Sequence, residues 1–149
     1  MKESISNNFF EAIKQFKQLP PSTTFPEGLY EVFWVGPKWF QFVAKHGLSL
    51  FGFKNWVGKE FSGNDQAINV FSNSTNGERT KRFPMEVLHQ PSNIDSKVCI
   101  KVCYPRSTRF PWPFVIDEFR FFEPNKLIGL SYTKGFSALP LPFHLIKKE

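Results

Sequence analysis

The chain has 149 residues, of which 41% are hydrophobic and 17% aromatic, and its 19 Lys+Arg against 13 Asp+Glu give a formal net charge of +6. This length suits one domain, and the aromatic content excludes intrinsic disorder, which needs little apolar surface to bury. No apolar run approaches the ~20 residues of a membrane-spanning helix, and the N-terminus lacks the basic-then-apolar order of a signal peptide. We therefore expect a single domain over residues 1–149 and a cytoplasmic location.

The positive charges occur in short groups, such as Arg79, Lys81 and Arg82, and they form no continuous stripe. No zinc-finger, basic-zipper or helix-turn-helix spacing is present, so nucleic acid is not an expected partner. Transient contact with an anionic membrane surface fits the charge better. The loop from Arg106 to Pro113 places two arginines beside Phe110 and Trp112, a mixture that suits such a contact at a barrel rim.

Two short helices are predicted near the N-terminus. Phe9, Ile13 and Phe16 repeat at helical spacing within residues 1–18, and Leu19-Pro20-Pro21 ends that helix. A second helix is predicted from Lys38 to His46, between Pro37 and Gly47.

Most of the remaining chain has the pattern of short strands separated by turns. About eight strands at intervals of roughly ten residues indicate an antiparallel β-barrel or sandwich. The strands are expected at residues 28–36, 54–61, 66–72, 82–89, 97–104, 114–122, 127–134 and 141–147. The fold class is therefore mainly β.

Six short motifs follow one another along the chain: Leu19-Pro20-Pro21, Trp34-Val-Gly36, Trp56-Val-Gly-Lys-Glu-Phe61, Val115-Ile-Asp-Glu-Phe-Arg120, Leu127-Ile-Gly129 and Pro142-Phe-His-Leu-Ile-Lys-Lys148. In this order they resemble the GXWXG family over residues 19–62 and the companion DUF4334 family over residues 63–149. The resemblance implies a lipocalin-like barrel of unknown function. Val32 stands where the family motif has its first glycine, and Tyr132 stands where an acidic residue is expected.

No cofactor, metal or catalytic motif is evident. The three histidines fall in no metal-binding spacing, and there is no nucleophile elbow or glycine-rich phosphate loop. Cys99 and Cys103 lie about 13 Å apart if residues 97–104 form a strand, which is too far for a disulfide. We expect two free thiols.

Arg120 is the first candidate ligand-binding residue. Strand alternation places it on the face of Glu118 and opposite Asp117. If Arg120 points into the barrel, it needs an anionic partner, either Glu118 or the carboxylate or phosphate of a ligand. An internal salt bridge is favoured over the ligand contact.

Further candidates are one lysine and several aromatic residues. Lys59 shares a strand face with Phe61 and either lies on the surface, which is favoured, or extends from the barrel mouth to water. Trp34, Trp56, Tyr30 and Tyr132 are candidates to line a cavity, although each also suits a plain core.

The leading hypothesis is a carrier for a small hydrophobic ligand with an anionic head, such as a fatty acid or phospholipid, bound inside the barrel. The first alternative is an enzyme that acts on a hydrophobic molecule in the same cavity, with Asp117, Glu118 or His144 as proton carriers. The second is a barrel filled by side chains that acts through its surface as a protein-interaction module.

Overall fold

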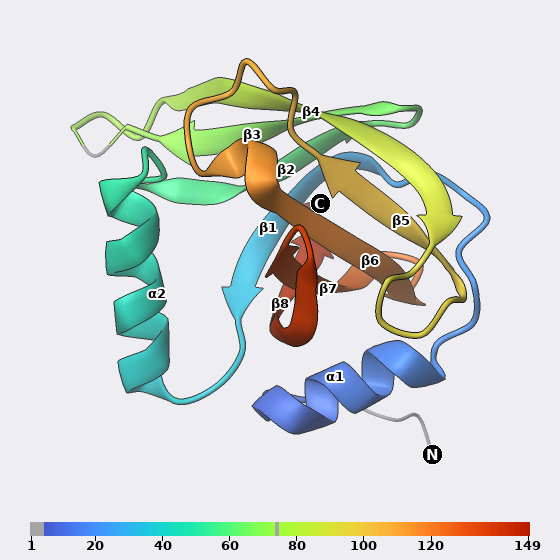
Figure 1. Cartoon of the computed structure of the whole chain (residues 1–149). Helices are drawn as coiled ribbons and strands as arrows, with labels where there is room; N and C mark the ends of the chain where they lie inside the picture. The colour runs from blue at the N-terminus through green and yellow to red at the C-terminus, as the bar shows by residue number, and fades with distance from the viewer. Residues whose placement is uncertain (1–4, 74) are drawn as a thin grey trace.

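The computed structural model describes residues 5–73 and 75–149, and its main feature is a closed antiparallel barrel (Figure 1). Each strand pairs with the next along the chain, and the last strand pairs with the first. In chain order the elements are α1 (Phe9–Gln18), β1 (Glu27–Trp34), α2 (Lys38–Leu50), β2 (Trp56–Ser62), β3 (Gln66–Ser72), β4 (Arg79–Pro91), β5 (Val98–Cys103), the 3₁₀ turn η1 (Trp112–Phe114), β6 (Val115–Glu123), β7 (Lys126–Thr133) and β8 (Phe136–Lys147). The predicted mainly-β barrel with two helices is confirmed.

The simple antiparallel order divides the connections between the two ends of the barrel. The connections β1–β2, β3–β4, β5–β6 and β7–β8 lie at one end, here called the mouth end, and the other three lie at the far end. Helix α2 belongs to the first of these connections and therefore stands at the mouth end (Figure 1).

Helix α1 packs against the outside of the barrel, across β6, β7 and β8. The side chain of Asn8 accepts a hydrogen bond from the Glu11 backbone N–H and so caps the start of the helix. Phe16 is fully buried against Cys99, Ile128 and Leu130 on the outer face of the sheet. The barrel wall beneath α1 is consequently buried on both faces.

Helix α2 continues to Leu50, beyond the predicted end at Gly47. Gly47 keeps ordinary helical geometry, whereas Gly52 has a φ of +92°, the left-handed conformation that favours glycine after a helix. The prediction selected the wrong one of two glycines five residues apart.

The barrel interior holds the main core, with Tyr30, Phe61, Phe119 and Leu127 among its buried members. Gly58 is required by close approach, since a Cβ at this position would lie 1.9 Å from the carbonyl oxygen of Tyr30 on the paired strand. Cys99 and Cys103 are both free, as predicted.

Candidate functional site

A cavity of about 180 Å³ lies inside the barrel at the mouth end, and α2 lies over it. Most of its wall is apolar, and α2 contributes Phe40, Ala44 and Leu48 at a helical spacing of four. The aromatic residues from the barrel and its loops are Trp34, Phe53, Trp56, Trp112 and Phe143. The polar side chains in the wall are Lys59, Tyr104, Asp117 and Ser131. An apolar cavity with a few convergent polar groups is the usual form of a small-molecule site.

Lys59 and Asp117 form an ion pair in the cavity wall. Lys59 Nζ lies 3.2 Å from Asp117 Oδ2, and the two side chains are 1% and 7% exposed. The residues come from β2 and β6, which do not pair with each other, so only the closed barrel brings them together. The prediction that favoured a surface position for Lys59 is wrong, because its strand face is the interior one that also carries Phe61.

Tyr104 and Asn69 complete the polar cluster around the ammonium group. Lys59 Nζ donates to Asn69 Oδ1 at 3.1 Å and to Tyr104 Oη at 3.3 Å. Asn69 Nδ2 in turn donates to Tyr104 Oη at 2.9 Å and to the Phe83 carbonyl at 3.1 Å. The Lys59 ammonium group also lies 5.3 Å from the ring centroid of Trp56, within range of a cation–π interaction.

This environment keeps Lys59 charged. Burial alone would lower the pKa of Lys59, but Tyr104 and Asp117 act in the opposite direction, and the pKa is raised above its ordinary value. Burial raises the pKa of Tyr104, which therefore remains a neutral phenol near pH 7. The cavity thus presents an ammonium group whose charge is balanced by the carboxylate beside it.

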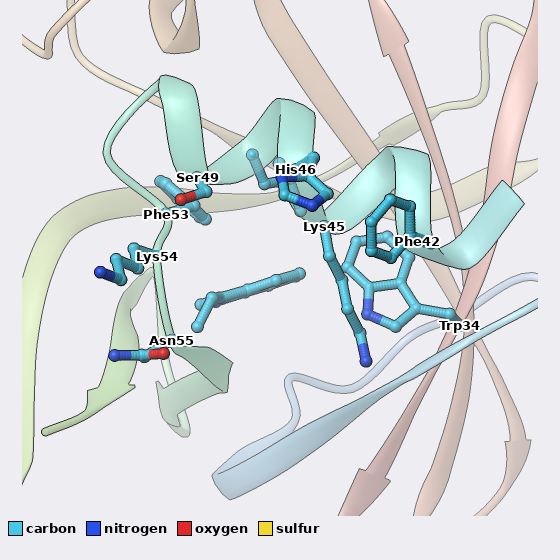
Figure 2. Close-up of a pocket in the computed structure, with 10 residues that line it drawn as sticks. Trp34, Phe42, Lys45, His46, Ser49, Phe53, Lys54 and Asn55 are labelled. Atoms are coloured by element: carbon cyan, nitrogen blue, oxygen red, sulfur yellow. The ribbon is translucent and has the colours of Figure 1, made fainter. Parts of the chain in front are cut away.

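A second, more open hollow of about 440 Å³ adjoins the cavity. Trp34, Leu48, Phe53 and Trp56 line both spaces. Figure 2 shows Trp34, Phe42 and Lys45 on one side of the outer hollow, with Lys54 and Asn55 across from them. Trp34 and Trp56 therefore stand where a molecule would pass between the two spaces.

Arg120 lies outside the barrel, beneath α1. Its guanidinium group forms an ion pair with Asp95 and donates to the backbone carbonyls of Phe16 at 3.1 Å and Lys97 at 2.8 Å. The side chain is fully buried, with the guanidinium carbon 4.4 Å from the Phe16 ring centroid. The favoured internal salt bridge is present, but its partner is Asp95 and not Glu118, and the guanidinium group does not reach the cavity.

Tyr132 and Glu118 also lie on the outer face. Tyr132 Oη donates to Glu118 Oε2 at 2.5 Å, and the same carboxylate accepts hydrogen bonds from the Ser92 hydroxyl and from the Asn93 backbone N–H. Burial and the neighbouring Glu118 carboxylate raise the pKa of Tyr132. The hydrogen bonds to Glu118 hold the β4–β5 connection against the sheet, and neither Tyr132 nor Glu118 lines the cavity.

The remaining predicted residues are distributed between the interior and the outer face. Tyr30 is buried inside the barrel in edge-to-face contact with Phe61, and it borders a shallow hollow at the far end. His144 is buried on the outer face, and its Nε2 has no hydrogen-bond partner in the described part of the chain. Among the three expected proton carriers, only Asp117 lines the cavity.

The sequence analysis missed Asn69 and Tyr104. Strand alternation places Asn69 on one face with Ala67 and Phe71, which belong to the core. A polar residue between two core residues could therefore have been predicted to be a buried polar group. Tyr104 follows the end of β5 and had no comparable signal, because its partners are 35 and 45 residues away in sequence.

Comparison with known proteins supports the fold but does not assign the chain to a family. No family model matches the chain and no curated protein matches it, so the GXWXG and DUF4334 resemblance stays a prediction. The chain is similar in structure to a protein from Thermomonospora curvata, with a TM-score of 0.63 and 18% identity, over 90% of this chain and 83% of that one. This likeness supports the barrel architecture.

Within residues 5–73 and 75–149, no cluster of three or more His, Cys, Asp or Glu side chains is arranged to hold a metal ion. In the same residues, neither helix has the length and apolar character required to cross a bilayer.

Proposed function

We propose that this protein binds and carries a small, mainly apolar molecule in the cavity at the mouth end. The observation that supports this most strongly is the Lys59–Asp117 pair, which is buried yet lines a cavity with largely aromatic walls. Removing two charges from water costs several kcal/mol per ion, and a well-packed apolar pair of similar volume is often as stable. A pair retained at the edge of a cavity is therefore well placed to meet a polar group of a bound molecule.

The charge balance favours a neutral polar group on that molecule. The expectation was that Arg120, with Lys59 or Tyr132, would meet an anionic head, but Arg120 and Tyr132 lie on the outer face and the charge of Lys59 is balanced by Asp117. A hydroxyl or carbonyl oxygen would accept a hydrogen bond from the Tyr104 hydroxyl without adding charge, since the three N–H groups of Lys59 already meet Asp117, Asn69 and Tyr104. A fatty-acid carboxylate would bring a second anion close to Asp117, and like charges at short range disfavour each other.

The dimensions of the two spaces limit the size of the ligand. The inner cavity of about 180 Å³ is smaller than the roughly 300–1,000 Å³ of drug-sized ligand sites. A longer molecule would place its polar end at the Tyr104 hydroxyl, beside the Lys59–Asp117 pair, and its apolar chain between Trp34 and Trp56, toward the outer hollow. Medium-length alcohols and ketones fit this arrangement better than a phospholipid does.

Calorimetric titration of delipidated protein with decanol, a decanone and decanoate tests the proposal. We expect the alcohol and the ketone to bind at least about tenfold more tightly than decanoate, because only decanoate adds a charge beside Asp117. The double variant Lys59→Met/Asp117→Leu removes the pair without leaving one charge alone, and it should lose this preference. Lys126→Met, which removes a partly exposed lysine paired with Glu123, is the matched control and should bind as the wild type does.

Two results would contradict the proposal. Tightest binding of decanoate would restore the anionic-head hypothesis. Absence of binding by all three probes would favour a barrel that acts through its surface.

The same pair supports acid–base catalysis as a second candidate function. Asp117 offers a base and Lys59 an acid, 3.2 Å apart at the wall of one cavity. Incubating the protein with a decanone in deuterated water and following deuterium incorporation beside the carbonyl by mass spectrometry tests this. Incorporation that Asp117→Asn abolishes would support catalysis, and incorporation at the buffer rate would exclude it for this substrate class.

A further inference from the structure

Exposed apolar side chains are concentrated at the mouth end of the barrel. Of fourteen large apolar side chains exposed in the described residues, ten lie in the segments 37–55, 104–114 and 134–141, here called the mouth face. The most exposed are Leu50 at 76%, Trp39 at 69%, Leu139 at 68% and Phe110 at 67%.

The three segments form one continuous surface. Trp112 Nε1 in the second segment donates to the Phe51 carbonyl in the first at 2.9 Å, and the rings of Phe51 and Phe110 are 6.4 Å apart. The backbone N–H of Lys134 in the third segment donates to the Phe114 carbonyl at 2.7 Å. The barrel order places all three at the same end, where α2 stands in Figure 1.

The charge on this surface has one sign. The mouth face contains six basic residues and no acidic one, so it carries as much positive charge as the formal net charge of +6 of the whole chain. All six basic side chains are exposed, and none has an ion-pair partner among the described residues. They are Lys38, Lys45, Lys54, Arg106, Arg109 and Lys134. The fourth connection at this end, residues 73–78, contains Glu78 and contributes no exposed large apolar side chain.

We propose that the mouth face docks on an anionic lipid bilayer, with Trp39, Leu50 and Phe110 entering the interfacial region. Exposed aromatic and leucine side chains surrounded by Lys and Arg match the composition of segments that lie in a membrane interface. Each basic residue near an anionic membrane surface contributes about 1 kcal/mol, which is roughly fivefold in affinity. A protein partner fits less well, since the cores of protein interfaces are depleted of lysine.

The position of α2 connects this surface with the cavity. Phe40, Ala44 and Leu48 face the cavity, whereas Trp39, Val43 and Leu50 are exposed on the mouth face. A protein docked in this way would hold the cavity entrance against the lipid, which suits exchange of an apolar ligand. This last step depends on the proposed function, but docking itself does not.

Vesicle cosedimentation tests the docking. Wild-type protein should sediment with mixed phosphatidylcholine–phosphatidylserine vesicles, bind pure phosphatidylcholine at least about tenfold more weakly, and dissociate as salt is raised. Trp39→Ser/Leu50→Ser and Lys38→Glu/Arg106→Glu alter exposed side chains outside the cavity wall and should each weaken binding by at least about tenfold. Val98→Ser/Lys17→Glu changes one exposed apolar and one exposed basic side chain at the far end of the barrel and should have no effect.

Three outcomes would overturn the proposal. Equal binding to neutral and anionic vesicles would remove the role of the basic residues. Unchanged binding of Trp39→Ser/Leu50→Ser would remove the role of insertion. A wild-type dimer in sedimentation velocity that this double variant dissociates, without vesicle binding, would show that a second copy covers the mouth face. Titration with decanol in the absence of vesicles measures binding in the cavity independently of docking. A failure of the docking proposal can therefore be distinguished from a failure of the cavity proposal.

Discussion

Two buried ion pairs lie on opposite faces of the same strand, β6, and differ in what surrounds them. Asp117 faces the interior and pairs with Lys59 beside a cavity, whereas Arg120 faces outward and pairs with Asp95 beneath α1. The two terminal nitrogens of Arg120 bond to two backbone carbonyls and to both carboxylate oxygens of Asp95, and the guanidinium group lies over the Phe16 ring, although Nε has no partner among the described residues. The Lys59 pair keeps one side open to the cavity.

The comparison shows that burial and pairing alone do not identify a site. Arg120 joins α1, the β4–β5 connection and β6, so its role is to hold the outer layer on the barrel. The Lys59 pair joins strands that the closed barrel already holds in place. We therefore expect the outer pair to control stability and the inner pair to control binding.

The largest effect is expected from Arg120→Met. The substitution leaves Asp95 largely buried without its partner and removes two hydrogen bonds to backbone carbonyls. We expect the free energy of unfolding in urea to fall by about 3–5 kcal/mol, with α1 becoming accessible to proteases. A loss below about 1 kcal/mol would mean that the outer pair does not hold α1.

Acid should weaken the outer layer through His144. Burial lowers the pKa of His144 from 6.5 to about 4, so the unfolded chain binds the proton more tightly than the folded one. The stability present above pH 6.5 is therefore lost as the pH falls from 6.5 toward 4, by about 3 kcal/mol in total.

Urea unfolding across this pH range measures the loss. His144→Phe should abolish it, whereas His46→Gln, at an exposed position, should leave it unchanged. Asp95 causes a separate loss of stability. Burial alone would raise the pKa of Asp95, but the hydrogen bonds from Arg120 lower it. That loss begins only below pH 3.8, so the two groups can be separated. An identical pH dependence in His144→Phe and wild type would contradict this account.

The inner pair should matter little for stability. Replacing both partners in Lys59→Met/Asp117→Leu removes the cost of burying two charges together with their attraction. We expect the free energy of unfolding to stay within about 2 kcal/mol of wild type or to increase. A loss comparable to that of Arg120→Met would show that the inner pair is structural as well.

The smallest effect is expected from Tyr104→Phe. The change removes one hydroxyl that accepts from Lys59 and Asn69 and should cost about 1 kcal/mol of stability. It should weaken binding of decanol several-fold and leave the exposed side chains of the mouth face unaltered, because Tyr104 is buried. Calorimetry and vesicle cosedimentation measure the two properties separately. Unchanged decanol binding would exclude Tyr104 from the ligand site.

Hydrophobic alternation and turn residues are local properties, so the sequence predicted the strands and a barrel or sandwich, and the family resemblance implied the barrel that the structure has. Sequence reasoning also placed Asp117 and Arg120 on opposite faces of one strand, which the structure confirms. It did not determine which face is interior, because alternation identifies the inside only where the other face is polar. Here α1 covers the outer face, and β6 is buried on both sides from Ile116 to Arg120.

Partner identity was also beyond a single sequence. Lys59 finds Asp117 across the barrel, and Arg120 finds Asp95 in the β4–β5 connection. Neither contact can be predicted from the spacing of the two residues in the sequence. Buried charges became interpretable only once closure of the barrel showed which of them border empty space.

Native mass spectrometry of the freshly purified protein, followed by organic extraction, tests the central claim most directly. We predict a discrete added mass on the wild type, which extraction identifies as a neutral apolar molecule with a hydroxyl or carbonyl group. The mass should be absent from Lys59→Met/Asp117→Leu and present on Lys126→Met. An equal mass on all three proteins, or an extracted fatty acid, would contradict the account of the Lys59–Asp117 pair.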